Sequence, residues 1–383
     1  MFHSSTIQLS KSALQSNYNY IKNIIGKDVD ISCVVKGNAY GHGIESFIDV
    51  AEMCGINHFS VYSSDEAYRI WLHNSTNSEI MIMGWIDEPE IEWAIENEIQ
   101  FYVFNRERLE AAIKYSKKVS KPAIIHLEVE TGMNRVGINK KEINNICQTI
   151  IDNRESLIID GICTHYAGAE SIANYVRIHN QNKQFKDFVK LMSAKNIIAN
   201  RYHTASSAAT ISYPKMRNDF VRIGILMYGF WPSPETFIDH MTKHKLHLDP
   251  LKRIISWKSK LMSKKSVKRG QFVGYGNQFQ AQRDMIVGVV PVGYSHGFAR
   301  SLSNSGHVLI KGQWANVLGS VNMNLIIVGI TDIPEAEIGD EVVLIGEQGE
   351  RVITVHSFTE MTEHINYELL TRLPDNLPRV IVE

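Results

Sequence analysis

The chain has 383 residues, of which 44% are hydrophobic and 21% are charged, and its formal net charge at pH 7 is −1. This balance argues against a disordered chain and against a basic nucleic-acid-binding surface, so we expect a small molecule as the partner. The length suits two domains, one of which could be a barrel of about 250 residues.

The segment from about residue 10 to 230 alternates short apolar strands with amphipathic helices. Helices are predicted at 11–26, 43–55, 63–74, 105–119 and 176–196, where apolar residues recur at helical spacing. Strands are predicted at 29–36, 58–63, 79–84, 99–104, 122–130, 159–166, 200–206 and 220–229. Eight strands alternating with helices are typical of a parallel sheet that closes into a (β/α)8 barrel.

After about residue 245 the sequence is rich in strand patterns separated by glycine-rich turns. These patterns lie at 253–267, 271–279, 285–294, 307–319, 324–330 and 341–347. The predicted fold class is therefore α/β, with a (β/α)8 TIM-type barrel at 10–240. A C-terminal all-β domain is expected at 241–383, and residues 1–9 are expected to join it.

Compartment and partners can be predicted from what the sequence lacks. No apolar run approaches the ~18 residues of a membrane helix, and the start MFHSSTIQLSKSAL has no basic segment followed by an apolar one. The four cysteines share no close spacing, which argues against a metal knuckle or a disulfide framework. We expect a cytoplasmic protein that contacts neither membrane nor nucleic acid.

Polar residues gather at the predicted strand ends, and active sites of such barrels lie at the carboxyl ends of the strands. The first strand ends at Lys36, and the fifth leads into HLEVETGMNRVG. The candidate site residues at these ends are Lys36, Glu128, Glu130, Arg135, His165, Ser206, Ser207 and Arg222.

Lys36 follows ISCVV, a run typical of a strand buried on both faces, and precedes GNAYGHG, a turn of small residues. Most lysines at a strand end simply extend into solvent. The alternative is a Schiff-base lysine, whose amine becomes nucleophilic when apolar or cationic surroundings lower its pKa. The residues by themselves leave both interpretations open.

Five motifs, in this order, resemble those of the alanine racemases, a family of pyridoxal-phosphate enzymes with a barrel and a β domain. They are VVKGNAYGHG (34–43), TGMNRVG (131–137), VRIGILMYG (221–229), VGYGN (273–277) and NYELLTRLPDNLPR (366–379). The resemblance implies an isomerase that interconverts L- and D-alanine with pyridoxal 5'-phosphate and works as a homodimer. Such an enzyme would supply D-alanine for peptidoglycan precursors.

The resemblance also assigns roles to single residues. The two bases would be Lys36, which also carries the cofactor, and Tyr275 of the partner subunit, on opposite faces of the substrate's α-carbon. The implied cofactor-binding residues are Lys36, Tyr40, Arg135, His165, Ser207, Arg222, Gly224, Ile225 and Tyr367. The implied substrate-binding residues are Arg135, Tyr294 and Met323, and no metal ligands are expected.

Four positions depart from the family pattern. Many members have a lysine that becomes carbamylated and braces the arginine, whereas this chain has Glu128, whose carboxylate would pair directly with Arg135. The other departures, which replace charged residues, are His296, Ser320 and Asn324. Racemisation of serine, lysine or arginine therefore stays an alternative to racemisation of alanine.

Two further functions occur on related scaffolds. A non-catalytic pyridoxal-phosphate carrier would share the barrel and the lysine, but it would have no use for Tyr275 or for a β domain. A decarboxylase would need an acidic group against the ring nitrogen of the cofactor and a cysteine from the β domain. Here Arg222 takes the first position, and all four cysteines precede residue 164.

Overall fold

The computed structural model describes residues 3–73, 75–355 and 366–383. The chain folds into two compact units. We call them the barrel unit, Ser12–Gly37 with Ile48–Lys252, and the strand-rich unit, Met1–Lys11 with Asn38–Phe47 and Arg253–Glu383. The chain therefore leaves the barrel unit just after Lys36 and returns to it at Ile48.

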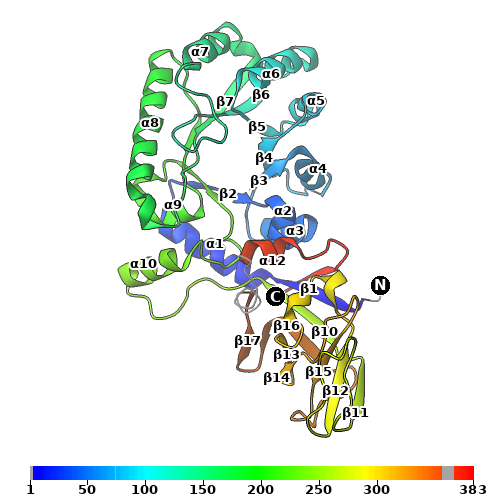
Figure 1. The fold of residues 1–383 in the computed structure, drawn as a ribbon. Coiled ribbons are helices and arrows are strands. Elements are labelled where there is room, and N and C mark those ends of the chain that lie inside the picture. Colours follow the sequence, from blue (N-terminus) through cyan, green and yellow to red (C-terminus); the bar gives the residue numbers. More distant parts are fainter. Residues whose placement is uncertain (1–2, 74, 356–365) are drawn as a thin grey trace. The chain divides into compact units, whose positions relative to one another are not determined.

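Within the described residues, the barrel unit contains one sheet of eight parallel strands in the order β8-β7-β6-β5-β4-β3-β2-β9 (Figure 1). Its two edges meet just beyond β8, where the amide of Arg222 donates a hydrogen bond of 3.0 Å to the carbonyl of Ala205. The sheet is thus a nearly closed barrel, as predicted. Its strands are β2 (Asp30–Val34), β3 (His58–Ser63), β4 (Glu79–Trp85), β5 (Gln100–Val103), β6 (Ala123–Glu128), β7 (Leu157–Cys163), β8 (Arg201–His203) and β9 (Phe220–Ile223).

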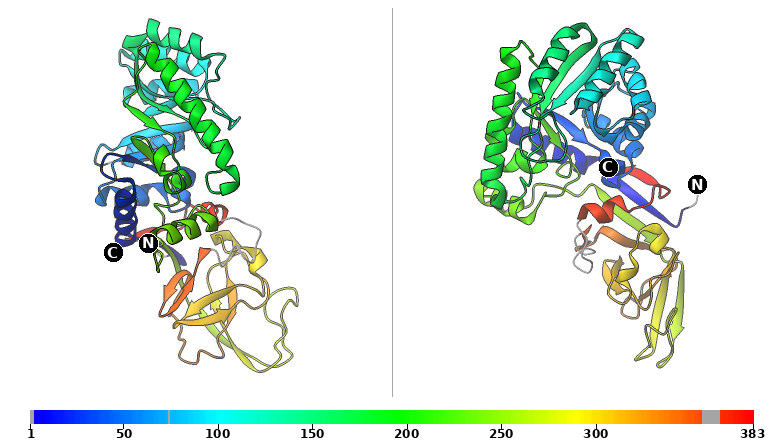
Figure 2. Two further views of the ribbon diagram at one scale, coloured as in Figure 1. Left: turned by 90° about the vertical axis from the view of Figure 1, so that its left-hand side faces the viewer. Right: turned by 45° about the horizontal axis from the view of Figure 1, so that its top comes forward.

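Helices cover the outer face of this sheet (Figure 2). The sequence patterns had not pointed to α5, which begins with a capping box at Asp87 and Glu90. Nor had they pointed to α7, although Ile143, Ile146 and Ile150 recur on its buried face. The helices are α1 (Lys11–Ile25), α3 (Ile44–Met53), α4 (Ser64–His73), α5 (Glu88–Glu96), α6 (Arg106–Val119), α7 (Ile143–Asp152), α8 (Tyr175–Ala194), α9 (Ser207–Ser212) and α10 (Pro234–His244).

The strand-rich unit is built from two sheets. The larger has the order β14-β13-β16-β10-β1-β18, with β17 beside β16, and the smaller has the order β11-β12-β15. Strand β1 (Ser5–Ser10), from the start of the chain, pairs with β10 (Ile255–Lys260) and with β18 (Arg379–Val382), near the end of the chain. The other strands are β11 (Ser263–Val267), β12 (Met285–Val290), β13 (His307–Ile310), β14 (Gln313–Asn316), β15 (Ile326–Gly329), β16 (Glu341–Gln348) and β17 (Arg351–Ile353).

The cysteines and the helices each have one further feature. All four cysteines are buried and free. Among the residues that the structure describes, no helix has both the length and the apolar character needed to cross a bilayer.

Candidate active site

Lys36 lies two residues beyond the end of β2 and begins the short helix α2 (Lys36–Tyr40). The backbone that follows is unusual, because three non-glycine residues in a row, Asn38, Ala39 and Tyr40, have φ between +50° and +54°. Residues with a Cβ rarely adopt this left-handed region, and strained backbone of this kind clusters at functional sites. The chain therefore turns sharply at the point where it delivers the lysine.

The surroundings of Lys36 favour its neutral amine. Burial by the surrounding protein lowers the pKa of Lys36, and the positive charge of Arg135 lowers it further, while Glu66 acts in the opposite sense. Solvent still reaches the side chain in the single chain. A lysine in such a setting is a better nucleophile and base at neutral pH than a free lysine.

Arg222, on β9, is 5% exposed, and its guanidinium is held by the ends of neighbouring strands. Nη1 donates to His203 Nδ1 at 2.6 Å and to the carbonyl of His203 at 3.0 Å. Nη2 donates to the carbonyl of Thr164 at 3.0 Å. Within the described residues, Nε makes no hydrogen bond, so one donor of the fork is left for a bound group.

His165, one of the implied cofactor-binding residues, lies beyond β7. The side chains of His165 and Arg222 approach only to 3.5 Å, between Nη2 and His165 Nδ1, so His203 is the closer imidazole partner. Burial and the positive charge of Arg222 lower the pKa of His165 to about 3, which leaves the ring neutral. No sequence motif pointed to His203; only the pairing of β8 with its neighbours reveals it.

Glu128 ends β6 inside the barrel and is 5% exposed. Its Oε1 lies 3.9 Å from Nη2 of Arg135, a distance that fits an ion pair but not a hydrogen bond. Burial raises the pKa of Glu128 to about 7, although the positive charges of Arg222 and Arg135 oppose the shift. Glu130 instead shapes the following loop, because its carboxylate accepts from the amides of Gly132 and Asn134.

The serines predicted at the end of β8 lie at the start of α9. Ser207 is buried, and its Oγ accepts a hydrogen bond of 2.9 Å from the amide of Gly224. Ile225 is buried beside Gly224, and Ser206 forms a parallel bridge with Arg222. Strands β8 and β9 thus bring these predicted residues to the same end of the barrel as Lys36 and Glu128, since all the strands are parallel.

The other predicted residues belong to the strand-rich unit. Tyr275 stands between Gly274 and Gly276, which both have positive φ, and it is 75% exposed. Tyr294 and Met323 are brought together because the amide of Tyr294 donates to the carbonyl of Asn322 at 3.0 Å and the amide of the next residue donates to the carbonyl of Met323 at 3.0 Å.

Two implied cofactor-binding residues, Tyr40 and Tyr367, belong to the strand-rich unit. Tyr40 is half-buried and packs with the strand-rich unit. Tyr367 lies in α12 (Asn366–Thr371), but its side chain is outside the described part of the structure. The roles of the predicted site residues stay predictions, although the structure brings Lys36, Glu128, Arg135, His165, Ser207 and Arg222 to the same end of the barrel.

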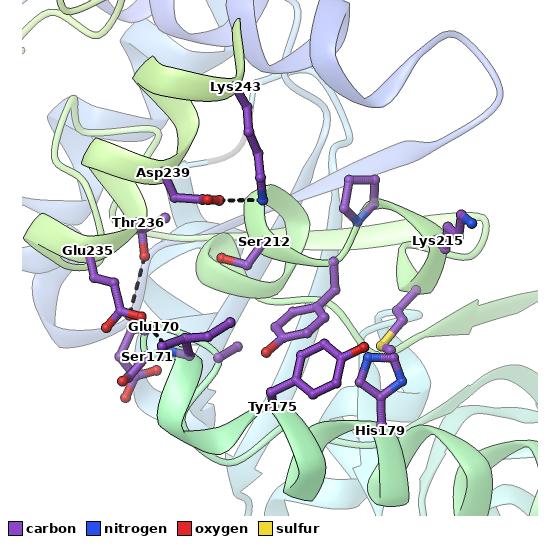
Figure 3. Close-up of a pocket in the computed structure, with 15 residues that line it drawn as sticks. Glu170, Ser171, Tyr175, His179, Ser212, Lys215, Glu235, Thr236, Asp239 and Lys243 are labelled. Carbon is purple, nitrogen blue, oxygen red and sulfur yellow. Dashed lines mark hydrogen bonds and ion pairs between the residues drawn. The ribbon is translucent and has the colours of Figure 1, made fainter.

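A cavity of about 580 Å³ lies elsewhere in the barrel unit, between α8, α9 and α10 (Figure 3). Its lining includes Tyr175 and His179 of α8, Ser212 of α9 and Thr236 of α10. Tyr175 and His179 line it with ring centroids 4.2 Å apart, and an ion pair of 2.7 Å joins Asp239 and Lys243. None of its lining residues is a predicted site residue, so the chemistry of the strand ends, not this cavity, defines the candidate active site.

The chain matches known families over nearly its whole length. The model described as "Alanine racemase, N-terminal domain" matches residues 9–232, and "Alanine racemase, C-terminal domain" matches residues 254–381. An alanine racemase of Leptospira interrogans is 34% identical over 387 residues, which cover 100% of this chain and 96% of the relative. An alanine racemase of Helicobacter pylori is 32% identical, with 99% of both chains covered.

Solved structures agree with these relatives. The alanine racemase of Clostridium difficile 630 has a TM-score of 0.89 at 28% identity, with 100% of this chain and 96% of that chain covered. The alanine racemase of Bacillus anthracis, solved with bound L-Ala-P, has a TM-score of 0.88 at 28% identity and the same coverage.

Proposed function

Because the chain belongs to the alanine racemase family, we propose that it interconverts L- and D-alanine with pyridoxal 5'-phosphate as its cofactor. Family membership makes the chain a racemase, which is an isomerase. The finer proposal depends on the position of Lys36. Its amine has a lowered pKa, and it lies at the same end of the barrel as Arg222, whose Nη1 and Nη2 are bonded to the protein while Nε can donate to a bound group.

The residues at this end of the barrel fit the cofactor. Lys36 would hold it covalently through Nζ, and Arg222 Nε would donate to the nitrogen of its ring. The phosphate would lie at the start of α9, beside Ser207 and Gly224. Bound there, pyridoxal phosphate supplies an electron-withdrawing ring that acidifies the α-carbon of the substrate.

Arg222 would also restrict which reaction follows. A guanidinium has only donors and stays charged, so it cannot take a proton from the ring nitrogen or share one with it. Opposite Nε, the ring nitrogen keeps its lone pair and withdraws less electron density than a protonated ring would. This favours return of a proton to the α-carbon over side reactions such as transamination.

Racemisation needs acid–base groups on both faces of the α-carbon, because one base can only return the proton to the face from which it came. Lys36 Nζ would serve one face and the phenol of Tyr275 of the partner subunit the other. The strand-rich unit supports contact with a second copy, because Tyr275, Phe272, Tyr294 and Met323 are 75%, 52%, 42% and 56% exposed. Large exposed aromatic and apolar side chains are typical of interaction sites when they form one patch.

A racemase with a wider substrate range is the second candidate. It is favoured by Ser320 and Asn324, which are neutral; Asn324 Nδ2 donates to Ser295 Oγ at 3.3 Å instead of entering an ion pair. A site approach with fewer charges admits longer or more polar substrates. The carrier hypothesis is disfavoured, since residues 254–381 match the C-terminal domain of alanine racemases.

Incubation of the purified protein with single L-amino acids in heavy water tests the proposal. Alanine should gain deuterium at the α-carbon and yield the D-enantiomer, whereas Lys36→Ala should do neither. Faster turnover of serine, lysine or arginine than of alanine would support the second candidate, a racemase with a wider substrate range, against the proposed alanine racemase. Deuterium uptake without any D-enantiomer would contradict racemisation by two bases.

A further inference from the structure

His126 is fully buried inside the barrel and connects Arg222 to the opposite end of the sheet. Arg222 Nη1 lies 2.6 Å from His203 Nδ1, and His203 Nε2 lies 2.9 Å from His126 Nδ1. His126 Nε2 lies 2.8 Å from Gln100 Oε1, and Gln100 Nε2 donates to Glu79 Oε2 at 2.6 Å. We call this unbroken row of five side chains the histidine chain.

The histidine chain runs along the inside of the barrel. Arg222 and His203 lie near the carboxyl ends of β9 and β8. Gln100 and Glu79 are the first residues of β5 and β4. Because the strands are parallel, the chain begins at the end that carries Lys36 and finishes at the other end.

The backbone is adapted to hold His126. The register of β6 against β7 shifts between Ile125 and His126, and such irregularities redirect side chains. On β7, a Cβ added at Gly161 would overlap His126 Nδ1. Only glycine therefore leaves space for this imidazole.

The direction of each hydrogen bond in the histidine chain follows from Arg222, at the end that carries Lys36. Arg222 can only donate, so His203 Nδ1 must accept and its proton must sit on Nε2. His203 Nε2 then donates to His126 Nδ1, which places the proton of His126 on Nε2. That nitrogen faces two acceptors, Gln100 Oε1 at 2.8 Å and Asp160 Oδ2 at 3.5 Å.

Glu79, at the other end of the histidine chain, independently gives the same direction for the hydrogen bonds. Glu79 pairs with Arg201, whose Nη2 lies 2.9 Å from Oε2, so the carboxylate is held as an acceptor. Gln100 must therefore present its NH2 group to Glu79 and its oxygen to His126. Burial lowers the pKa of both His126 and His203, and nearby positive charges act in the same sense, so both rings are neutral.

We infer that His126 is a positioning residue for Arg222: its Nδ1 accepts a hydrogen bond from Nε2–H of His203, it is itself aligned by Gln100 and Glu79, and it so fixes the guanidinium at the cofactor end of the barrel. In the opposite tautomer, His203 Nδ1–H would point at the donor Nη1, and Arg222 would lose its shortest hydrogen bond. The inference rests on the proposed function only for the claim that Arg222 faces the cofactor.

The tautomers can be measured directly by nitrogen NMR of the full-length protein labelled at its histidines. Both His126 and His203 should be neutral with the proton on Nε2 throughout the neutral pH range. A cationic ring, or a proton on Nδ1 of either residue, would overturn the inference. This readout does not depend on activity or on the proposed function.

A matched pair of substitutions tests the effect on Arg222. His126→Asn keeps an oxygen that can accept from His203, whereas His126→Leu has a similar size and no acceptor. His126→Leu should lower kcat about tenfold or more, since the lost hydrogen bond is worth ~1.4 kcal/mol, and should shift the absorption band of the bound cofactor. His126→Asn should retain both properties more closely, with KM for substrate unchanged in either variant.

The remote end has its own control. Glu79→Gln should change kcat and the absorption band in the same direction as His126→Leu, to a smaller extent. Glu341→Gln is the control, because it removes an ion pair with Lys258 of matching exposure: the basic side chain is 24% exposed and the acidic one 45%, as in the pair of Arg201 and Glu79. Glu341→Gln should change neither kcat nor the absorption band. If His126→Asn and His126→Leu had the same kcat and the same absorption band, His126 would act only through packing. That result would overturn the inference even if the protein racemises alanine.

Discussion

Replacement of Glu128 with glutamine should stabilise the folded chain above neutral pH while lowering its activity. Burial raises the pKa of Glu128 from 4.5 to about 7. Between these values the folded chain holds a proton that the unfolded chain has released, so stability falls as pH rises through this window. At ~1.4 kcal/mol per pH unit, the cost of the ionised carboxylate reaches about 3 kcal/mol at pH 8.

Glutamine does not titrate, so Glu128→Gln should be more stable than the wild type by up to about 3 kcal/mol at pH 8 and by under about 1 kcal/mol at pH 5. Urea unfolding at both pH values measures the difference. Glu88→Gln is the control of opposite sign, because Lys114 lowers the pKa of Glu88. That variant should be less stable than the wild type by a similar small amount at pH 5 and at pH 8, because Glu88 is ionised in both states above its ordinary pKa of 4.5, and the difference should shrink only below that value.

Activity should move the other way. The ionised carboxylate lies 3.9 Å from Arg135, whose side chain is half-exposed, so the pair is worth about 1 kcal/mol after screening by water. Loss of this ion pair with Arg135 should lower the rate of racemisation about five- to tenfold. The wild-type rate should rise through about pH 7 and the rate of Glu128→Gln should not; an unchanged pH profile of stability and rate in this variant would refute the reasoning.

Further substitutions probe other parts of the site and the barrel. Borohydride treatment of the holoenzyme should attach the reduced cofactor to Lys36, as peptide mass spectrometry will show; a cofactor fixed to another lysine rejects the assignment. Gly161→Ala should destabilise the protein by about 1–3 kcal/mol in urea, because its methyl group overlaps His126; unchanged stability would mean that the ring moves freely. Tyr228→Phe should cost about 1 kcal/mol, since the buried hydroxyl donates to the carbonyl of Val34 at 3.0 Å; an equally stable variant would show that water replaces this bond.

The barrel could be predicted because its signals are local. Apolar runs such as 31–35 and helical spacing such as 106–119 can be read within a few residues. The same kind of local signal is present for α5 and α7, in the capping box at Asp87 and in the spacing of Ile143 and Ile146.

The histidine chain could not be predicted from local signals. Glu79, Gln100, His126 and His203 come from four strands, and only the register of the sheet brings them into contact. The shift of register before His126 also breaks the alternation on which side-chain direction is predicted. Likewise, residues 38–47 pack with the strand-rich unit, and the backbone of Leu370, far away in sequence, approaches Gly41.

Mixing two inactive variants tests most directly whether one active site uses Lys36 from one subunit and Tyr275 of the partner subunit. Lys36→Ala and Tyr275→Phe should each be inactive in racemisation from L-alanine. After unfolding and refolding together, half of the dimers are mixed and each has one intact site, so about a quarter of wild-type activity should return. If both bases came from the same chain, no mixed dimer would have an intact site, and the absence of restored activity would contradict the account.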